Sequence, residues 1–341
     1  MIRHSRFCYF SFRSVRPLFL LRGGAATALV LLSVFVKAQD LPRLVTGGGD
    51  GVLKQWDKEG NAKEASIKHK GTVTALLVVP FSGGKTVISA GADGSLKEWD
   101  VEGMKPILEI EANTSGISAL ALSRDGKIAA TAGNDHKIAL WNVTTGKKLA
   151  EVEGSGGSVR ALQFAQDGTR LISGGSDRTI LVWRIQGEGS KTTLEYAASI
   201  QAHDEAVSGL AFSPDGNAFA SISADKFLKT WLLMGSQLKV RTKAADTGLS
   251  TLAYAPDGKT IATADENGHL RLWDSDKGTP LSLNYNVEKT LFTLAFSNDN
   301  KTLVGGGESG ILFYWNPLNG KEIRRIEKAH SDTLRALVVL P

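Results

Sequence analysis

Residues 203–232 read HDEAVSGLAFSPDGNAFASISADKFLKTWL and hold three short runs of β-forming residues. The runs AVSGLAF, AFASIS and FLKTW are separated by turn-forming residues, a pattern typical of antiparallel strands. The turn SPDG at 213–216 suits a tight hairpin, because proline presets φ, the aspartate side chain can bond to nearby backbone, and glycine takes a positive φ. We therefore expect a hairpin followed by a third strand that ends at Trp231.

The same pattern recurs along the chain, and tryptophan marks its period. The chain has seven tryptophans, spaced 43, 42, 42, 48, 42 and 42 residues apart, and runs such as SLKEWD and HLRLWD lead into them. They are Trp56, Trp99, Trp141, Trp183, Trp231, Trp273 and Trp315. Repeats of about 40 to 45 residues that carry strand-like segments are the signature of the blades of a β-propeller.

The repeats resemble those of the WD-repeat family over essentially all of residues 39–341. The Trp-Asp pair of that family is intact in three repeats, which end in Asp57, Asp100 and Asp274, and is changed in the other four. The resemblance implies an all-β fold, a seven-bladed propeller of four-stranded antiparallel blades that fills residues 39–341.

The two ends of the repeat region supply strands of different kinds. The region enters with a second strand at 43–47 and ends with an unpartnered first strand at 333–340. We expect both ends to share one blade, so that the C-terminal strand closes the ring and removes the exposed edges of an open array.

Most repeats contain polar residues at fixed distances from tryptophan, and their types are those of the catalytic triad of a hydrolase. An aspartate stands six residues before tryptophan in five repeats, serine or threonine precedes that position by four residues in six repeats, and three repeats add a histidine. The family resemblance implies a His–Ser/Thr–Asp–Trp network inside three blades. Its members are Thr46, Asp50, Trp56 and His330; His69, Ser89, Asp93 and Trp99; and His203, Ser221, Asp225 and Trp231. Because an active site needs one such set and buried polar groups need partners, we interpret the repeated set as structural.

No motif predicts a catalytic residue, a metal or a cofactor. The histidines lack the His-x-His or HExxH spacing of metal sites, and Cys-x-x-Cys is absent. The sequence contains neither a twelve-residue calcium loop nor a phosphate-binding loop. His136 and His269, near turns into third strands, are weak candidates for exposed functional residues.

In WD-repeat propellers, the loops that enter the first and third strands converge on one face, where partners commonly dock around the central channel. Carried onto this sequence, the starts of the first strands supply Thr74, Ser118, Arg160, Ser208, Ser250, Phe292 and Arg335. The turns before the third strands add Asn134, Ser176, Arg178, Lys226, Glu266 and Glu308.

Arg160, Phe292 and Arg335 are our principal partner-binding candidates, because these residue types can bury area and still make directed bonds. Arg178 and Lys226 are secondary candidates. The alternative is that Phe292 packs inside its blade and the arginines pair with neighbouring acids.

The one long tryptophan interval contains about six extra polar residues between Ile185 and Tyr196. We interpret them as a loop on the opposite face, either a secondary contact or tolerated length.

Residues 1–38 differ in composition from the rest of the chain. They include six basic residues and no acidic one, and the apolar run AATALVLLSVFV at 25–36 overlaps Val36-Lys37-Ala38, a site that suits signal peptidase. The run is shorter than the roughly 18 to 20 residues that cross a bilayer. We expect a signal peptide cleaved after Ala38, and secretion or a periplasmic location. The alternatives are an organellar transit peptide and an uncleaved anchor through which the chain meets a membrane.

The formal net charge of +5 is concentrated in this segment. Six of the 40 basic residues lie there and all 35 acidic residues lie beyond it, so the repeat region is close to neutral. A near-neutral domain lacks the positive field of a nucleic-acid-binding protein, so we expect no nucleic-acid partner. The single cysteine, Cys8, also lies in the segment, so the repeats contain no disulfide of their own.

These features favour an exported, non-catalytic scaffold that binds a protein or peptide on the channel face. Fold alone does not decide function. One alternative is an enzyme, lactonase-like or quinoprotein-like, that uses the channel. The other is a subunit of a fixed extracytoplasmic complex, which would show as an apolar surface patch.

Overall fold

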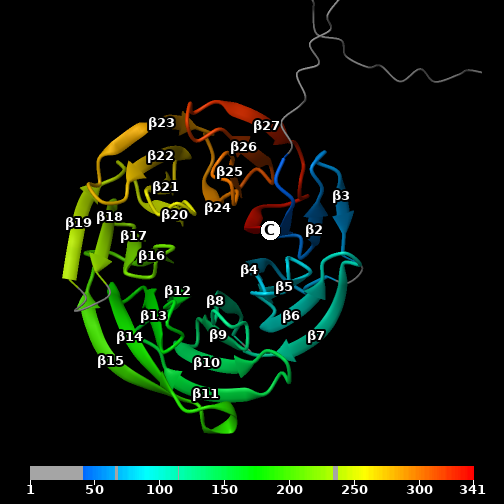
Figure 1. Cartoon of the computed structure of the whole chain (residues 1–341), viewed down its shortest axis with the longest axis vertical. Coiled ribbons are helices and arrows are strands. Elements are labelled where there is room, and N and C mark those ends of the chain that lie inside the picture. Colours follow the sequence, from blue (N-terminus) through cyan, green and yellow to red (C-terminus); the bar gives the residue numbers. More distant parts are fainter. Residues whose placement is uncertain (1–40, 66–67, 114, 233–236) are drawn as a thin grey trace, which may run out of the picture. The chain divides into compact units, whose positions relative to one another are not determined.

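A computed structural model describes residues 41–341, apart from 66–67, 114 and 233–236. The presequence predicted at residues 1–38 lies outside the described residues. The described chain forms seven four-stranded antiparallel sheets arranged in a ring, as Figure 1 shows. The innermost strands surround the central axis of this ring, which we call the channel. The predicted all-β, seven-bladed propeller is confirmed. Among the described residues, no helix has the length and apolar character needed to span a membrane.

The strands of each blade are given from the channel outward. Blade 1 contains β28 (Leu334–Val339), β1 (Leu44–Gly48), β2 (Leu53–Trp56) and β3 (Ala62–Glu64). Blade 2 contains β4 (Val73–Val78), β5 (Thr86–Gly91), β6 (Ser95–Asp100) and β7 (Lys105–Glu111). Blade 3 contains β8 (Ile117–Leu122), β9 (Ile128–Gly133), β10 (Lys137–Asn142) and β11 (Lys148–Glu153). Blade 4 contains β12 (Val159–Phe164), β13 (Arg170–Gly175), β14 (Thr179–Gln186) and β15 (Thr193–Gln201).

The remaining three blades follow the same order. Blade 5 contains β16 (Val207–Phe212), β17 (Ala218–Ser223), β18 (Phe227–Leu232) and β19 (Gln237–Lys243). Blade 6 contains β20 (Leu249–Tyr254), β21 (Thr260–Asp265), β22 (His269–Asp274) and β23 (Pro280–Asn286). Blade 7 contains β24 (Leu291–Phe296), β25 (Leu303–Gly307), β26 (Leu312–Trp315) and β27 (Glu322–Ile326).

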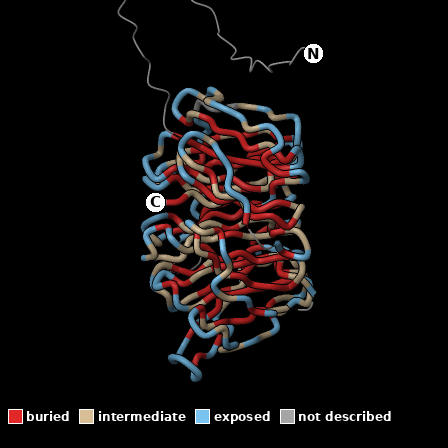
Figure 2. The backbone as a smooth tube through the Cα atoms, turned by 90° about the vertical axis from the view of Figure 1, so that its right-hand side faces the viewer, coloured by how far each residue is buried: buried red, intermediate tan, exposed pale blue. Residues whose placement is uncertain are grey.

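The hydrophobic core lies largely between neighbouring blades. One cluster joins Leu140 of blade 3 to Leu171 and Trp183 of blade 4, and comparable clusters fill the other junctions. Figure 2 shows the consequence, with buried backbone along the strands and exposed backbone at the loops of both ends. Because each sheet is covered on both faces, burial of apolar area holds neighbouring blades together.

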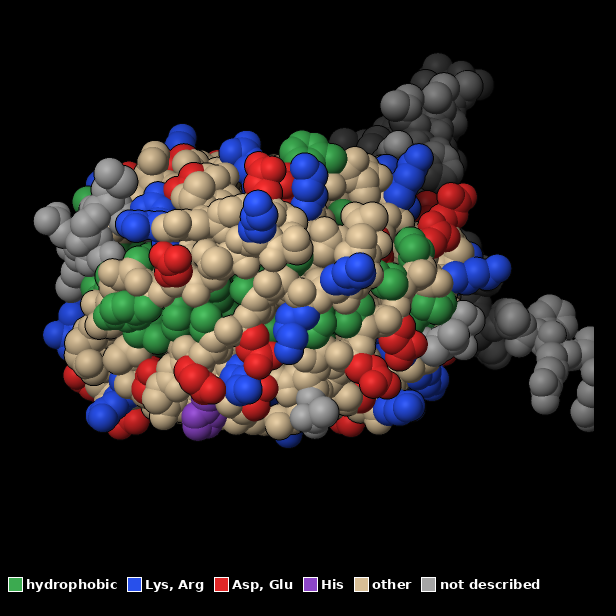
Figure 3. All heavy atoms as spheres, turned by 90° about the horizontal axis from the view of Figure 1, so that it is seen from below, with side chains coloured by type: hydrophobic (Ala, Val, Ile, Leu, Met, Phe, Trp, Pro, Cys, Tyr) green, Lys and Arg blue, Asp and Glu red, His purple; other side chains and the backbone are tan. Residues whose placement is uncertain are grey.

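The outermost strands leave part of their apolar surface in solvent. Ile107 on β7 is 57% exposed and Tyr196 on β15 is 61% exposed. Figure 3 views the ring edge-on and shows a band of hydrophobic side chains at the rim, with charged side chains above and below it.

The ring closes through the two ends of the chain, as the strand order predicted. β28 pairs antiparallel with β1, so that Leu44 faces Val339 and Thr46 faces Leu337. The Leu340 amide also donates to the Arg43 carbonyl at 2.8 Å. Blade 1 therefore combines three N-terminal strands with one C-terminal strand.

The hairpin predicted at 213–216 forms between the first and second strands of blade 5. In blade 5, the Ser213 hydroxyl donates to Asp215 Oδ1 at 2.6 Å, and the same oxygen accepts from the Asn217 amide at 3.1 Å. Gly216 closes the turn with a φ of 72°, a conformation that L side chains rarely adopt.

The extra residues of blade 4 do more than lengthen a loop. They extend β14 and β15, and the short 3-10 turn η1 (Gly189–Lys191) joins the two strands. Ile185 and Leu194 are buried in the cluster between blades 3 and 4. The expectation of a purely polar loop was therefore wrong for part of the insertion, because two of its flanking apolar residues continue the ladder.

Candidate functional site

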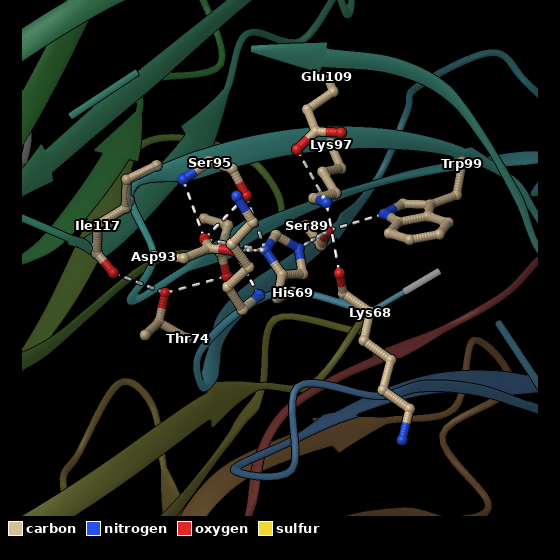
Figure 4. Close-up of polar contacts among 12 residues, drawn as sticks. Lys68, His69, Thr74, Ser89, Asp93, Ser95, Lys97, Trp99, Glu109 and Ile117 are labelled. Carbon is tan, nitrogen blue, oxygen red and sulfur yellow. Dashed lines mark hydrogen bonds and ion pairs between the residues drawn. The ribbon is translucent and has the colours of Figure 1, made fainter. Parts of the chain in front are cut away.

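The polar network of blade 2 links four side chains from three parts of the chain (Figure 4). Trp99 Nε1 donates to Ser89 Oγ at 2.8 Å, and His69 Nε2 lies 2.7 Å from the same oxygen. His69 Nδ1 lies 3.1 Å from Asp93 Oδ1. A proton on Nδ1 allows His69 to donate to Asp93 and to accept from Ser89, so every buried polar atom of the set has a partner.

Blades 1 and 5 repeat this geometry. In blade 1, Trp56 Nε1 donates to Thr46 Oγ1 at 2.8 Å, His330 Nε2 lies 2.8 Å from that oxygen, and His330 Nδ1 lies 3.1 Å from Asp50. In blade 5, the distances are 2.8 Å from Trp231 to Ser221, 2.7 Å from His203 to Ser221 and 2.8 Å from His203 to Asp225. The structure thus brings all twelve proposed network residues together in three sets.

Burial sets the protonation of these networks. It lowers the pKa of His69, His203 and His330, against the opposing effect of the aspartate beside each ring. Burial alone would raise the pKa of Asp93, but hydrogen bonds from the Ser95 amide and hydroxyl outweigh it and lower that pKa to about 2. At neutral pH the sets therefore hold neutral histidines beside carboxylates.

The order serine, histidine, aspartate is also that of a hydrolytic triad, but the surroundings differ. Thr46, Ser89 and Ser221 each have 0% exposure, and each hydroxyl oxygen already accepts a bond from tryptophan. A nucleophile needs a path to its substrate. The networks are built to satisfy buried groups.

A basic residue two positions before tryptophan belongs to the same networks and was not anticipated. Lys97 Nζ pairs with Glu109 at 3.0 Å and points to the Lys68 carbonyl, while Lys229 Nζ donates to the Ala202 carbonyl at 2.5 Å. Each carbonyl immediately precedes the network histidine. The recurring KQW, KEW and KTW segments were the available sequence signal.

Blade 6 uses an aspartate that the repeat spacing did not identify. The residue six positions before Trp273 is Asn267, but Asp265 takes the place of the turn aspartate, because its Oδ1 accepts from the amides of Asn267 and His269 at 3.0 Å each. His269 Nδ1 lies 3.1 Å from Asp265 Oδ2, and Arg271 lies 3.8 Å from the same oxygen. His269 is therefore engaged in its own blade.

Blade 7 has lost its network. Gly305 stands in place of serine or threonine, and neither Trp315 Nε1 nor Tyr314 Oη has a hydrogen-bond partner in the part of the chain that the structure describes. A Cβ at Gly305 would lie 2.7 Å from Leu294 Cδ2, so a larger residue there would require the Leu294 side chain to shift.

The seven residues predicted at the starts of the first strands share one local geometry. Each is the second residue of its inner strand and falls at a register shift, where it is the extra residue of a β-bulge. A bulge leaves one residue out of the ladder and redirects its side chain. The seven are Thr74, Ser118, Arg160, Ser208, Ser250, Phe292 and Arg335, and all but Arg335 line a hollow of about 210 Å³.

Four of the seven side chains make bonds within the ring itself. Three hydroxyls reach the inner strand of the next blade: Thr74 donates to the Ile117 carbonyl at 2.7 Å, Ser118 to that of Val159 at 2.5 Å, and Ser208 to that of Leu249 at 2.6 Å. The Ser250 hydroxyl donates to Ala264 within its own blade at 3.1 Å.

Arg160, Phe292 and Arg335 stand where the other blades have hydroxyls. The Arg335 guanidinium carbon lies 3.7 Å from the centroid of the Phe292 ring, so two of the three candidates contact each other directly. Neither arginine forms an ion pair or donates a hydrogen bond to a residue that the structure describes, Glu266 included. Burial lowers the pKa of Arg335, while Asp332 and Glu308 oppose that shift. The alternative of arginines neutralised by neighbouring acids is not what the geometry shows.

The secondary candidates lie in the turns between second and third strands and do not line the hollow. Arg178 and Lys226 are exposed and have φ values of 69° and 76°. Blades 1, 2, 6 and 7 place glycine at the equivalent position. Arg178 makes one long bond, 3.5 Å, to the Asp204 carbonyl. His136 has a φ of 65° at the same turn position. Three consecutive blades therefore place an exposed residue other than glycine there, with a strained backbone.

Within the residues that the structure describes, no three His, Cys, Asp or Glu side chains are grouped to hold a metal ion.

Comparisons with known proteins agree with this architecture. The WD domain, G-beta repeat matches residues 63–100, 104–142, 146–184, 194–231 and 236–274, which together exceed half of the chain. No curated protein matches. The crystal structure of the computationally designed Ika8 protein is similar, with a TM-score of 0.67, 27% sequence identity and 87% of each chain covered. Propellers of this repeat are commonly scaffolds that bind proteins or peptides. The chain belongs to the WD-repeat family.

Proposed function

We propose that this chain is an exported, non-catalytic scaffold that binds a protein or peptide on the channel face, with Arg160, Phe292 and Arg335 at the centre of the contact. Arg178 and Lys226 would contribute at its periphery. The supporting observation is the ring of seven β-bulges. Four of its side chains are committed to the propeller backbone, and the other three have no comparable structural bond.

The chemistry of the three residues suits recognition. Arginine and aromatic side chains dominate the energetic centres of protein interfaces, because they combine a large contact area with directed bonds. Turnover by the repeated Ser–His–Asp sets is disfavoured by the complete burial of Thr46, Ser89 and Ser221. Export rests on the composition of residues 1–38, and N-terminal sequencing of the secreted protein should begin at Gln39.

Affinity capture from the native extract, read by mass spectrometry, tests the function. The bait is the chain produced with its own N-terminal segment, beside an Arg160→Ala, Phe292→Ala, Arg335→Ala triple variant. A matched control changes Arg124, Arg184 and Ile107 to alanine, since these exposed residues lie on a hairpin, at the far end of β14 and on the rim.

A protein retained by the wild type and the control, and lost from a correctly folded triple variant, is the expected result. Equal retention by the triple variant would place the contact elsewhere. Failure to retain any protein, together with turnover of a small molecule that the triple variant abolishes, would favour the enzyme alternative.

A further inference from the structure

The stacked pair of Arg335 and Phe292 leaves one part of the arginine unoccupied. The guanidinium carbon of Arg335 lies over the Phe292 ring, 3.7 Å from its centroid. A cation over an aromatic face is held in place, and its side chain has less freedom to lose on binding. The N–H groups lie around the edge of the guanidinium plane, and none of them donates to a described residue.

Two acidic residues lie near Arg335, but neither forms an ion pair with its guanidinium. They are Asp332 and Glu308, which raise its pKa by their charge. The ring hydroxyls of Thr74 and Ser118 are already donated to backbone carbonyls. Among the bulge residues, the two guanidiniums are therefore the charged donors left for a ligand.

Arg160 is a second arginine whose guanidinium donates to no described residue, and it lines the hollow. It comes from β12, lines the same hollow as Phe292, and is exposed. One arginine comes from blade 4 and the other from blade 1, so the two cations enter the ring from separate blades. Separate, singly charged donors match single carboxylates, whereas a phosphate group is held by a cluster of arginines.

We propose that the channel mouth recognises a carboxylate side chain, aspartate or glutamate, presented by the partner, with Arg335 on Phe292 as its receptor and Arg160 as a second charge contact. The inference rests on the proposed function and specifies its partner: a protein segment with an acidic residue at its centre. Arginine offers a planar pair of donors that fits a carboxylate edge to edge.

An array of random nonapeptides with a fixed central residue tests the inference. Glutamate, aspartate, glutamine, asparagine and phosphoserine occupy the centre of otherwise identical libraries, and the probe is the full chain. We expect Glu- or Asp-centred peptides to bind about tenfold or more tightly than their amide counterparts, the range of a charge-assisted bond.

Three variants separate charge from shape. Arg335→Gln removes the main charge contact and should reduce the preference for acid over amide to the part that Arg160 supplies. Arg335→Lys should restore the preference only in part, because lysine cannot bind edge to edge. Arg184→Gln removes an exposed arginine from the far end of β14 and should leave the preference intact. Circular dichroism verifies that each variant keeps the propeller fold.

The outcomes distinguish this inference from the function beneath it. If acidic and amide peptides bind equally well and Phe292→Ala still loses this binding, carboxylate recognition is wrong. Partner binding on the channel face would still hold. A preference for phosphoserine over glutamate would replace the carboxylate by a phosphate. Peptide binding that ignores every channel variant would overturn both proposals.

Discussion

Ser89 bonds to two other side chains of the blade 2 network. Its hydroxyl accepts from Trp99 and bonds to His69, which in turn contacts Asp93. Ser173 occupies the equivalent place in blade 4, where its hydroxyl accepts from Trp183 at 2.9 Å and has no other side-chain partner among the described residues. The two blades therefore allow the same serine to be compared with and without a hydrogen bond to histidine.

Ser89→Ala should destabilise the protein more than Ser173→Ala. The first change leaves an indole N–H and a buried histidine nitrogen unpaired, and the second leaves only the indole, at about 1 to 3 kcal/mol for each unsatisfied group. Urea unfolding measures both variants against the wild type. Equal losses would mean that His69 finds another partner and that the network is less coupled than the distances suggest.

Repetition made most network residues predictable. Thr46, Ser89 and Ser221 could be assigned because six of the seven copies have serine or threonine at the same distance from tryptophan, and the family resemblance implied their bonds. Asp265 escaped because it occupies the last position of β21, where Gly or another small residue stands in most blades. When an aspartate reaches the turn from another backbone position, its distance from tryptophan differs from that in the other repeats. The repeat spacing therefore cannot identify it.

At the scale of elements, strand β28 carries more of the fold than its six residues suggest. It supplies the inner strand of blade 1 and packs between β24 and β4 at the channel. Without it, β1 becomes an exposed edge with unpaired backbone groups.

Removal of residues 334–341 should unlatch the ring, whereas removal of Pro341 alone should leave it closed. Loss of the β1–β28 ladder exposes Thr46 and the blade 1 core, so the amides of β1 should lose protection from hydrogen exchange. Mass spectrometry of peptides from residues 41–56 reports this directly. Retained protection in the longer truncation would show that blade 1 is stable with three strands.

The positions of the strands could be predicted from the sequence, but the β-bulges in the inner strands could not. Alternation and turn residues mark where strands begin and end, because they reflect side-chain burial and backbone φ within one segment. A bulge depends on register against the neighbouring strand. The extension of β14 and β15 was missed for the same reason, since Ile185 and Leu194 gain their burial from blade 3.

For the whole molecule, three buried networks predict how stability responds to pH. The pKa values of His69, His203 and His330 are lowered from 6.5 by burial, so the unfolded chain binds more protons than the folded one as pH falls below 6.5. The pKa values of Asp50, Asp93 and Asp225 are also lowered, from 3.8. Stability should therefore fall below pH 6.5 and fall again below about pH 4.

His203→Gln should weaken the first of these losses. Thermal unfolding at pH 7.5 and pH 5 gives the difference for the wild type and the variant, and the variant should show the smaller difference because one titrating group is gone. His136→Gln, at an exposed turn, is the matched control and should behave like the wild type. An unchanged difference in His203→Gln would assign the pH response to other groups.

The candidate site shows where prediction from sequence ends. The seven ring positions could be assigned from family resemblance, because the phase of each first strand is regular. The stacking of Arg335 on Phe292 could not, since it joins side chains of neighbouring blades through their rotamers. Nor could sequence show that four ring hydroxyls are already bonded to backbone, which is what singles out the other three.

Blade 1 also imposes an order of events on the newly made chain. The bond between Thr46 and His330 spans 284 residues, so β1 has no partner on this side until β28 has been made. At a synthesis rate of about 5 to 20 residues per second, this wait lasts roughly 15 to 60 seconds. Throughout it, β1 has a free edge able to pair with another chain. The propeller thus becomes safe from such pairing only after β28 has been made, so the nascent chain depends on whatever shields that edge until then.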